Sequence, residues 1–151
     1  MVVETRLWCG AMACWLFLFP ISALAQHPAT VGDLLDKGGK KLAKDEVTQL
    51  VSGATVSGAS FNDPQTTRVY TYRDNGSISG HSIVAMVPSS SRPVAGKWAI
   101  SDQGQICVDR ESSRTGKTDH YCGFYFVLNN SYYEAGTDAR SASIFSREIK
   151  R

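Results

Sequence analysis

Three histidines, His27, His81 and His120, are the side chains of this chain best suited to acid–base chemistry. A general base would have to be one of them, or a carboxylate with a raised pKa. His120 has the best candidate partner, because one strand register sets it opposite Asp109. No serine or free thiol is placed beside that pair as a nucleophile, which favours a structural cross-strand contact. A small hydrolase that uses His120 or His81 is the second alternative function.

The common catalytic and cofactor motifs are absent from the sequence. No stretch reads G-x-S-x-G, H-E-x-x-H, C-x-x-C or a dinucleotide-binding fingerprint. Gly116-Lys117-Thr118 looks like the end of a phosphate loop, but Glu111 stands where the first glycine is needed. We therefore expect a protein without catalysis, without a cofactor and without a metal site.

The amino-terminal stretch, residues 7–25, predicts export. It reads LWCGAMACWLFLFPISALA: an apolar run, the helix breaker Pro20 and a final Ala-Leu-Ala cleavage site. Cleavage after Ala25 would remove Cys9 and Cys14 and release the remainder into the periplasm or the medium. An uncleaved anchor is the alternative, because the stretch is just long enough to be considered as a membrane span. A lipid-modified Cys14 fits less well, since more apolar sequence follows it.

Only Cys107 and Cys122 would remain after cleavage, so a single intramolecular disulfide is predicted. Closing a loop of this size stabilises a fold by about 3 kcal/mol. A zinc site is disfavoured, because two thiols without a nearby pair of histidines make half a ligand set.

Composition predicts one compact domain in residues 26–151. The removed segment carries one acidic and one basic residue, so the net charge stays at +2. Such a small charge, with both signs interspersed, argues against nucleic acid and acidic membranes as partners. We expect a monomer that contacts no membrane once the signal is removed.

The elements expected are two short helices followed by an antiparallel β-barrel or sandwich. Residues 26–53 have the helical signals: Thr30 can cap the first helix, and Gly53 can end the second. Short runs of β-branched and aromatic residues, separated by turn residues, follow. The predicted strands are 54–61, 67–73, 77–87, 97–101, 105–111, 119–128, 131–135 and 142–150.

Three hairpins set strand register. Asp74-Asn75-Gly76 fits a two-residue type I′ turn or a three-residue loop. Asp102-Gln103-Gly104 fits the three-residue form better, because that form puts Ile100 opposite Ile106 and Trp98 opposite Val108. In the third hairpin, placing Cys107 opposite Cys122 makes two further pairs of complementary polar side chains. These pairs are Arg110 with Asp119 and Asp109 with His120.

The strand YCGFYFVL at 121–128 is apolar on both faces, which predicts a strand covered on both sides. Two exposed loops, Ser89–Val94 and Ser112–Lys117, are the expected binding surface. Their basic side chains are candidate anion contacts: Arg92, Arg114 and Lys117.

Four ordered blocks resemble a family of short exported bacterial proteins catalogued as a domain of unknown function. They read VGDLLDKGGKKLAKDEVTQLVSGATVSG, YTYRDNGSISG, GKWAISDQGQICV and YCGFYFV. The most specific part is G-x-W…G-x-x-C at Gly96, Trp98, Gly104 and Cys107, followed by Cys122. The resemblance implies no activity and therefore no site residues. Similar short elements recur in small disulfide-bonded barrels, including exported inhibitors of proteases and of lysozyme.

The function expected from the sequence is non-catalytic binding outside the cytoplasm. A disulfide-stapled β-domain offers rigid loops and a mouth that suit a small ligand or a partner protein, and fold alone does not choose between them. Inhibition of a hydrolase is the first alternative function.

Overall fold

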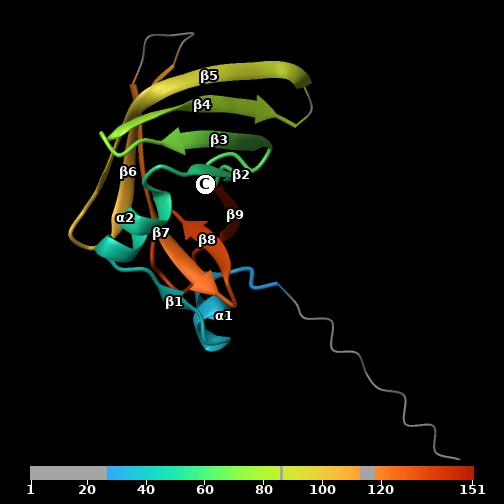
Figure 1. Ribbon diagram of the computed structural model, residues 1–151. Helices are drawn as coiled ribbons and strands as arrows, with labels where there is room; N and C mark the ends of the chain where they lie inside the picture. Colours follow the sequence, from blue (N-terminus) through green and yellow to red (C-terminus); the bar gives the residue numbers. More distant parts are fainter. Residues whose placement is uncertain (1–26, 86, 113–117) are drawn as a thin grey trace, which may run out of the picture.

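The chain forms a closed, eight-stranded, up-and-down antiparallel barrel (Figure 1). The computed structural model describes residues 27–85, 87–112 and 118–151. Each strand pairs with the next along the chain, and β9 returns to pair with β2. The fold class expected from the sequence is confirmed, and the closure makes it a barrel. The strands are β2 (Thr55–Ala59), β3 (Thr66–Tyr72), β4 (Ser77–Val84), β5 (Val87–Ile100), β6 (Gln105–Ser112), β7 (Thr118–Leu128), β8 (Ser131–Ala135) and β9 (Phe145–Lys150).

The prediction of a loop at Ser89–Val94 is wrong, because these residues belong to β5. The serines and proline of this stretch suggested a loop, yet Arg92 and Pro93 pair with Ser82 and His81 of β4. The β4–β5 ladder is irregular between Ser82 and Val84, at the end where these residues lie. A proline is tolerated near such a bulge, since a missing N–H there breaks little of the ladder.

The first two hairpins share one geometry. Gly76 and Gly104 have φ angles of 78° and 77°, and each N–H donates to a carbonyl oxygen three residues earlier, at 3.0 Å. Both loops are therefore the three-residue form with glycine in the left-handed region. The predicted pairs of Ile100 with Ile106 and Trp98 with Val108 are confirmed. The β7–β8 hairpin turns through Asn129 and Asn130, with φ angles of 49° and 62°.

The disulfide between Cys107 and Cys122 and the register built on it are confirmed. The two Cα atoms lie 4.1 Å apart, and the residues are direct partners in the β6–β7 ladder. Arg110 pairs with Asp119 and Asp109 with His120, as the sequence predicts.

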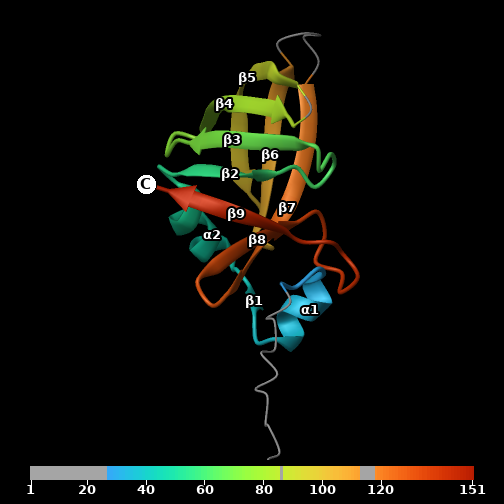
Figure 2. The same cartoon turned by 90° about the vertical axis from the view of Figure 1, so that its right-hand side faces the viewer.

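The two predicted helices are present and pack on different parts of the barrel (Figure 2). Helix α1 (Val31–Asp36) begins with a capping box formed by Thr30 and Asp33. It covers the second half of β7 from outside, where Phe126 is 1% exposed. A short strand β1 (Lys40–Lys41), not predicted, pairs with the end of β7.

Helix α2 (Lys44–Val51) closes one end of the barrel. Its Val47 and Val51 are fully buried in the same apolar cluster as Ile78, Ile106 and Val108 of the barrel wall. β2, β4 and β6 run toward the opposite end. In the described part of the chain, no helix is both long and apolar enough to cross a bilayer.

The contact between α2 and the β5–β6 turn gives a matched test of the fold. A Cβ atom on Gly104 would lie 2.9 Å from the Leu42 carbonyl oxygen, whereas at Gly76 the nearest atom would be 3.5 Å away. Gly76→Ala should cost about 1 kcal/mol for the left-handed backbone alone. Gly104→Ala should cost at least about 1 kcal/mol more, because it also crowds the chain that leads into α2. Urea unfolding of both variants measures the difference, and equal losses would contradict this packing.

Candidate binding site at the open end of the barrel

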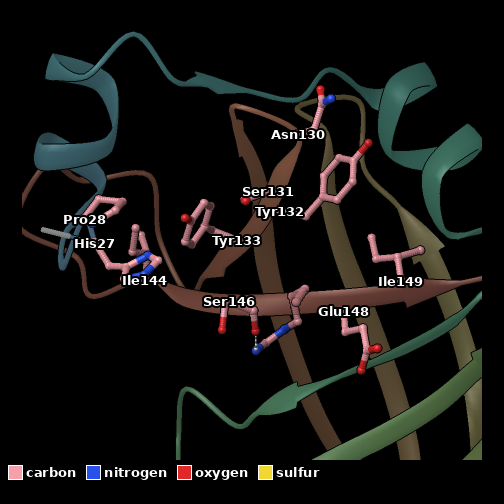
Figure 3. A pocket seen from close by; sticks show the side chains of 11 residues that line it. His27, Pro28, Asn130, Ser131, Tyr132, Tyr133, Ile144, Ser146, Glu148 and Ile149 are labelled. Carbon is pink, nitrogen blue, oxygen red and sulfur yellow. Dashed lines mark hydrogen bonds between the residues drawn. The ribbon is translucent and has the colours of Figure 1, made fainter. Parts of the chain in front are cut away.

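One groove is formed by β8, β9 and the residues around them (Figure 3). It has a volume of about 650 Å³, and Tyr132, Tyr133, Ile144 and Ile149 supply its apolar lining. Arg147 also lines the groove and is buried, but it already donates to Glu134 at 2.7 Å and to the Ser146 carbonyl oxygen at 2.9 Å. Glu148 is exposed and paired with Lys150 at 2.9 Å. The charged groups of the groove are thus already paired, which leaves them less able to fix the orientation of a ligand.

At the end of the barrel opposite α2, the inward-facing residues become polar. No helix of the described residues covers this end, which we call the open end. Directly opposed residues of an antiparallel pair point to the same face. Arg68 on β3 is opposite Ser82 on β4, which is opposite Arg92 on β5. Arg110 on β6 is likewise opposite Asp119 on β7. Three arginines, Arg68, Arg92 and Arg110, therefore point to the interior face of the barrel near this end.

Arg68 is a buried cation between aromatic rings. Only 8% of its surface is exposed. Its guanidinium carbon lies 4.5 Å from the ring centroid of Tyr121 and 5.7 Å from that of Phe61. Its Nε atom is buried and has no hydrogen-bond partner among the described residues. Such an atom costs free energy unless water or a ligand satisfies it.

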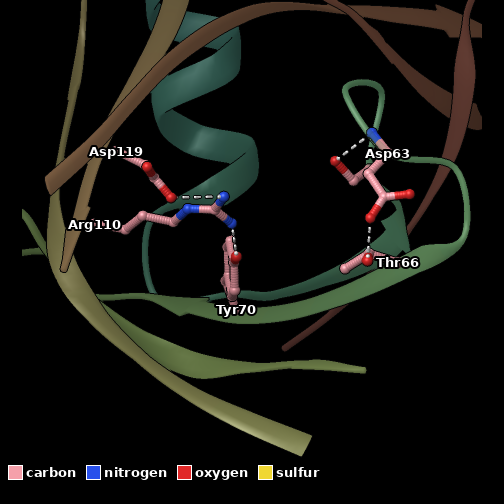
Figure 4. A network of polar contacts seen from close by, with 6 residues as sticks. Asp63, Thr66, Tyr70, Arg110 and Asp119 are labelled. Carbon is pink, nitrogen blue, oxygen red and sulfur yellow. Dashed lines mark hydrogen bonds and ion pairs between the residues drawn. The ribbon is translucent and has the colours of Figure 1, made fainter. Parts of the chain in front are cut away.

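Arg110 spans the barrel interior from β6 to β3 (Figure 4). Its Nη1 donates to the Tyr70 hydroxyl at 3.0 Å, and its Nη2 donates to Asp119 at 3.2 Å. Its side chain is 22% exposed. Gly96 lies opposite it, and a Cβ there would be 2.9 Å from the Arg110 Cα atom. This arginine is therefore held rigidly but still meets solvent.

The β2–β3 loop holds Phe61 over Arg68. The Thr66 hydroxyl donates to the Asp63 carboxylate at 2.6 Å, and the Asp63 N–H donates to the Ser60 hydroxyl at 3.3 Å (Figure 4). Phe61 then meets Tyr121 edge to face, with ring centroids 5.8 Å apart. The aromatic surroundings of the guanidinium are thus fixed in place.

Below this layer lies a buried ion pair. Arg147 donates to Glu134 at 2.7 Å, and the two side chains are 4% and 8% exposed. Burial alone would lower the pKa of Arg147, but the Glu134 carboxylate beside it raises that pKa above its usual value. Gly58 and Gly123 provide the space for this ion pair, since a Cβ atom on either glycine would lie within 2.7 Å of it.

The space that remains inside is small. A cavity of about 10 Å³ touches Arg68, the ion pair and several tyrosines, which is room for about one water molecule. A ligand would therefore lie at the rim, with only an acceptor group reaching Arg68.

The residues singled out from the sequence lie apart from one another. Arg92 is exposed on β5, at the open end. Arg114 and Lys117 lie outside the described residues. His81 and His120 lie on the outer wall, and the His120 side chain is 61% exposed. The sulfur beside His120 belongs to the disulfide, so it is not a nucleophile in this state.

Sequence reasoning missed Arg68, which the alternation of TTRVYTY could have found. In a strand, Arg68, Tyr70 and Tyr72 share one face, and that face is the barrel interior. The two tyrosines of this strand suggested an apolar core, and Arg68 on the same face was left unexamined.

Comparisons with known protein families, with characterised proteins and with solved structures find no match to this chain. The resemblance to a family of exported bacterial proteins therefore stays a prediction.

The buried ion pair should be a major stabilising contact in its present surroundings. Glu134→Gln keeps the shape but leaves Arg147 as an uncompensated buried charge, and should cost about 3–5 kcal/mol. Asp36→Asn, which removes the exposed partner of Arg140, is the matched control and should change stability little. Urea unfolding curves compare the two, and a small loss for Glu134→Gln would contradict the burial of this pair.

The buried phenols make stability fall in alkaline solution. Burial raises the pKa values of Tyr72, Tyr121 and Tyr125 above the ordinary value for tyrosine, so these three hydroxyls stay protonated in the folded barrel at a pH where free tyrosine ionises. Unfolded tyrosines ionise near pH 10, so stability is lost as pH rises above about 10. Tyrosinate absorbance should show these three ionising together with unfolding. Ionisation of all six tyrosines near pH 10 with the fold intact would contradict this.

Proposed function

We propose that this protein is a non-catalytic binding protein that works outside the cytoplasm and holds a small anionic ligand at the open end of its barrel. The observation that carries the proposal is Arg68, a cation 92% removed from solvent with an unsatisfied Nε atom. A structural arginine at that depth would normally be paired with a carboxylate. Arg147 is paired in that way with Glu134, whereas Arg68 has no carboxylate partner in the part of the chain that the structure describes.

The surroundings of Arg68 favour a carboxylate joined to a flat or apolar body. The guanidinium presents a planar array of donors that matches a carboxylate. Phe61 and Tyr121 supply rings against which an apolar body can pack. Arg92 and Arg110 add positive charge at the rim, and Asp119 already neutralises part of the charge of Arg110.

Two features support a place outside the cytoplasm. A disulfide between Cys107 and Cys122 fits a non-reducing compartment. The amino-terminal segment has the pattern of an export signal.

Inhibition of a hydrolase has less support. It needs a protruding loop with ordered side chains, and one of the two loops on which it rested, Ser89–Val94, is part of a strand.

The proposal predicts opposite effects of one substitution on stability and on binding. Arg68→Met keeps an unbranched side chain that reaches the position of Nε and removes the unpaired charge, so the ligand-free barrel should become more stable by about 1 kcal/mol or more. The same variant should lose at least tenfold in affinity for benzoate, a planar carboxylate. Urea unfolding and isothermal calorimetry on the full chain measure the two effects.

Arg73→Met is the control, because Arg73 is exposed at the end of β3 and should leave both quantities unchanged. Inorganic phosphate and benzylamine serve as further probes, and benzylamine should not bind. Destabilisation by Arg68→Met, together with absence of benzoate and phosphate binding to the unaltered protein, would show that Arg68 is structural and would contradict the proposal.

A further inference from the structure

Four side chains form a square on the outer wall, on the opposite face of β6 and β7 from Arg110 and Asp119. Cys107 and Asp109 alternate on β6, and His120 and Cys122 alternate on β7, so all four share the outer face. Cys107 is directly opposite Cys122, and Asp109 is directly opposite His120. The ligand atoms of Cys107, His120 and Cys122 all lie within 4.8 Å of one another.

His120 is held with one ring nitrogen toward the sulfurs. Its Nδ1 lies 2.6 Å from the Asp109 carboxylate, and its Nε2 lies 3.2 Å from the Cys122 sulfur. A carboxylate on Nδ1 fixes the proton there and leaves Nε2 as a lone-pair donor. This carboxylate–histidine arrangement is the one that orients histidine ligands of zinc.

The disulfide at present uses the electron pairs that a metal would need. Reduction would convert it to two thiols, and loss of their protons would give two thiolates beside one neutral imidazole. Two sulfurs on one tetrahedral zinc ion are about 3.8 Å apart, given Zn–S bonds of about 2.3 Å. Cys107 and Cys122 are direct partners on neighbouring strands, so both sulfurs can reach one ion without a change in strand pairing.

We propose that the reduced protein binds one Zn²⁺ ion through Cys107, Cys122 and His120, with Asp109 orienting the histidine and the fourth position open to solvent. The disulfide and the metal are then alternative states of one site. A disulfide oxidant accepts two electrons from the zinc-bound thiolates. The products are the Cys107–Cys122 bond, free Zn²⁺ and, with two protons taken up, two thiols of the oxidant. A dithiol reductant reverses the exchange.

The surface around the square is compatible with a cation. Lys97 on β5 is opposite Asp109 and is exposed, so its ammonium group is free to point into solvent. The charge of the two thiolates exceeds that of this one lysine. Because the outer face is uncovered at His120, which is 61% exposed, an ion can enter without opening the barrel.

Cobalt titration tests the site directly. The full chain carries Cys9→Ser and Cys14→Ser, so that Cys107 and Cys122 are its only thiols, and it is reduced with a phosphine and kept without oxygen. One equivalent of Co²⁺ should produce thiolate-to-cobalt charge-transfer bands, and Zn²⁺ should abolish them. The oxidised form of the same protein should show no bands.

Matched variants assign the ligands. Asp109→Asn should lower zinc affinity about 10- to 100-fold, as loss of a carboxylate behind a histidine ligand does. His120→Ala should lower it further, and His81→Ala, on the outer face of β4, should leave it unchanged. Circular dichroism follows the fold, and a reduced chain that unfolds should refold with Zn²⁺. Absence of cobalt–thiolate bands, or bands unaffected by His120→Ala, would overturn the proposal.

Discussion

Closure of eight strands into a barrel sends every second side chain into a space that water can hardly reach. Each inward side chain must then be apolar, be paired with a polar partner, or remain unpaired at a cost in free energy. Near α2 the inward residues are apolar, and Val47 and Val51 seal that end. Further along the axis the interior holds Glu134 with Arg147, and beyond that pair lies Arg68.

Strand register determines which of these polar residues meet. The disulfide pairs Cys107 with Cys122, and the same ladder sets Arg110 beside Asp119. Arg110 then reaches Tyr70 across the barrel, while Phe61 and Tyr121 enclose Arg68. One arginine is thus paired in the interior, one is shared between two strands, and one keeps an unsatisfied donor. That difference among the three arginines, rather than the barrel itself, is the basis of the proposed binding site.

Local signals were enough for most of the fold. Glycine turns and the cysteine pair predicted two registers correctly, because each depends on a few neighbouring residues. The extent of β5 was not predictable in this way, since Arg92 and Pro93 are held in the sheet by pairing with β4 and not by their own preferences. The site was missed for a related reason. In sequence, a cationic residue in a strand of alternating pattern is normally assigned to the solvent-facing side. Only the closed barrel shows that the face of Arg68 is the interior.

Nuclear magnetic resonance of the arginine Nε–H groups tests the central claim most directly. In ¹⁵N-labelled protein, Arg68 and Arg147 should give separate side-chain signals, because Arg147 donates to Glu134 and Arg68 has no such partner. Addition of benzoate should shift the Arg68 signal saturably and leave the Arg147 signal in place. An Arg68 signal that responds to neither benzoate nor phosphate would contradict a ligand site at the open end of the barrel.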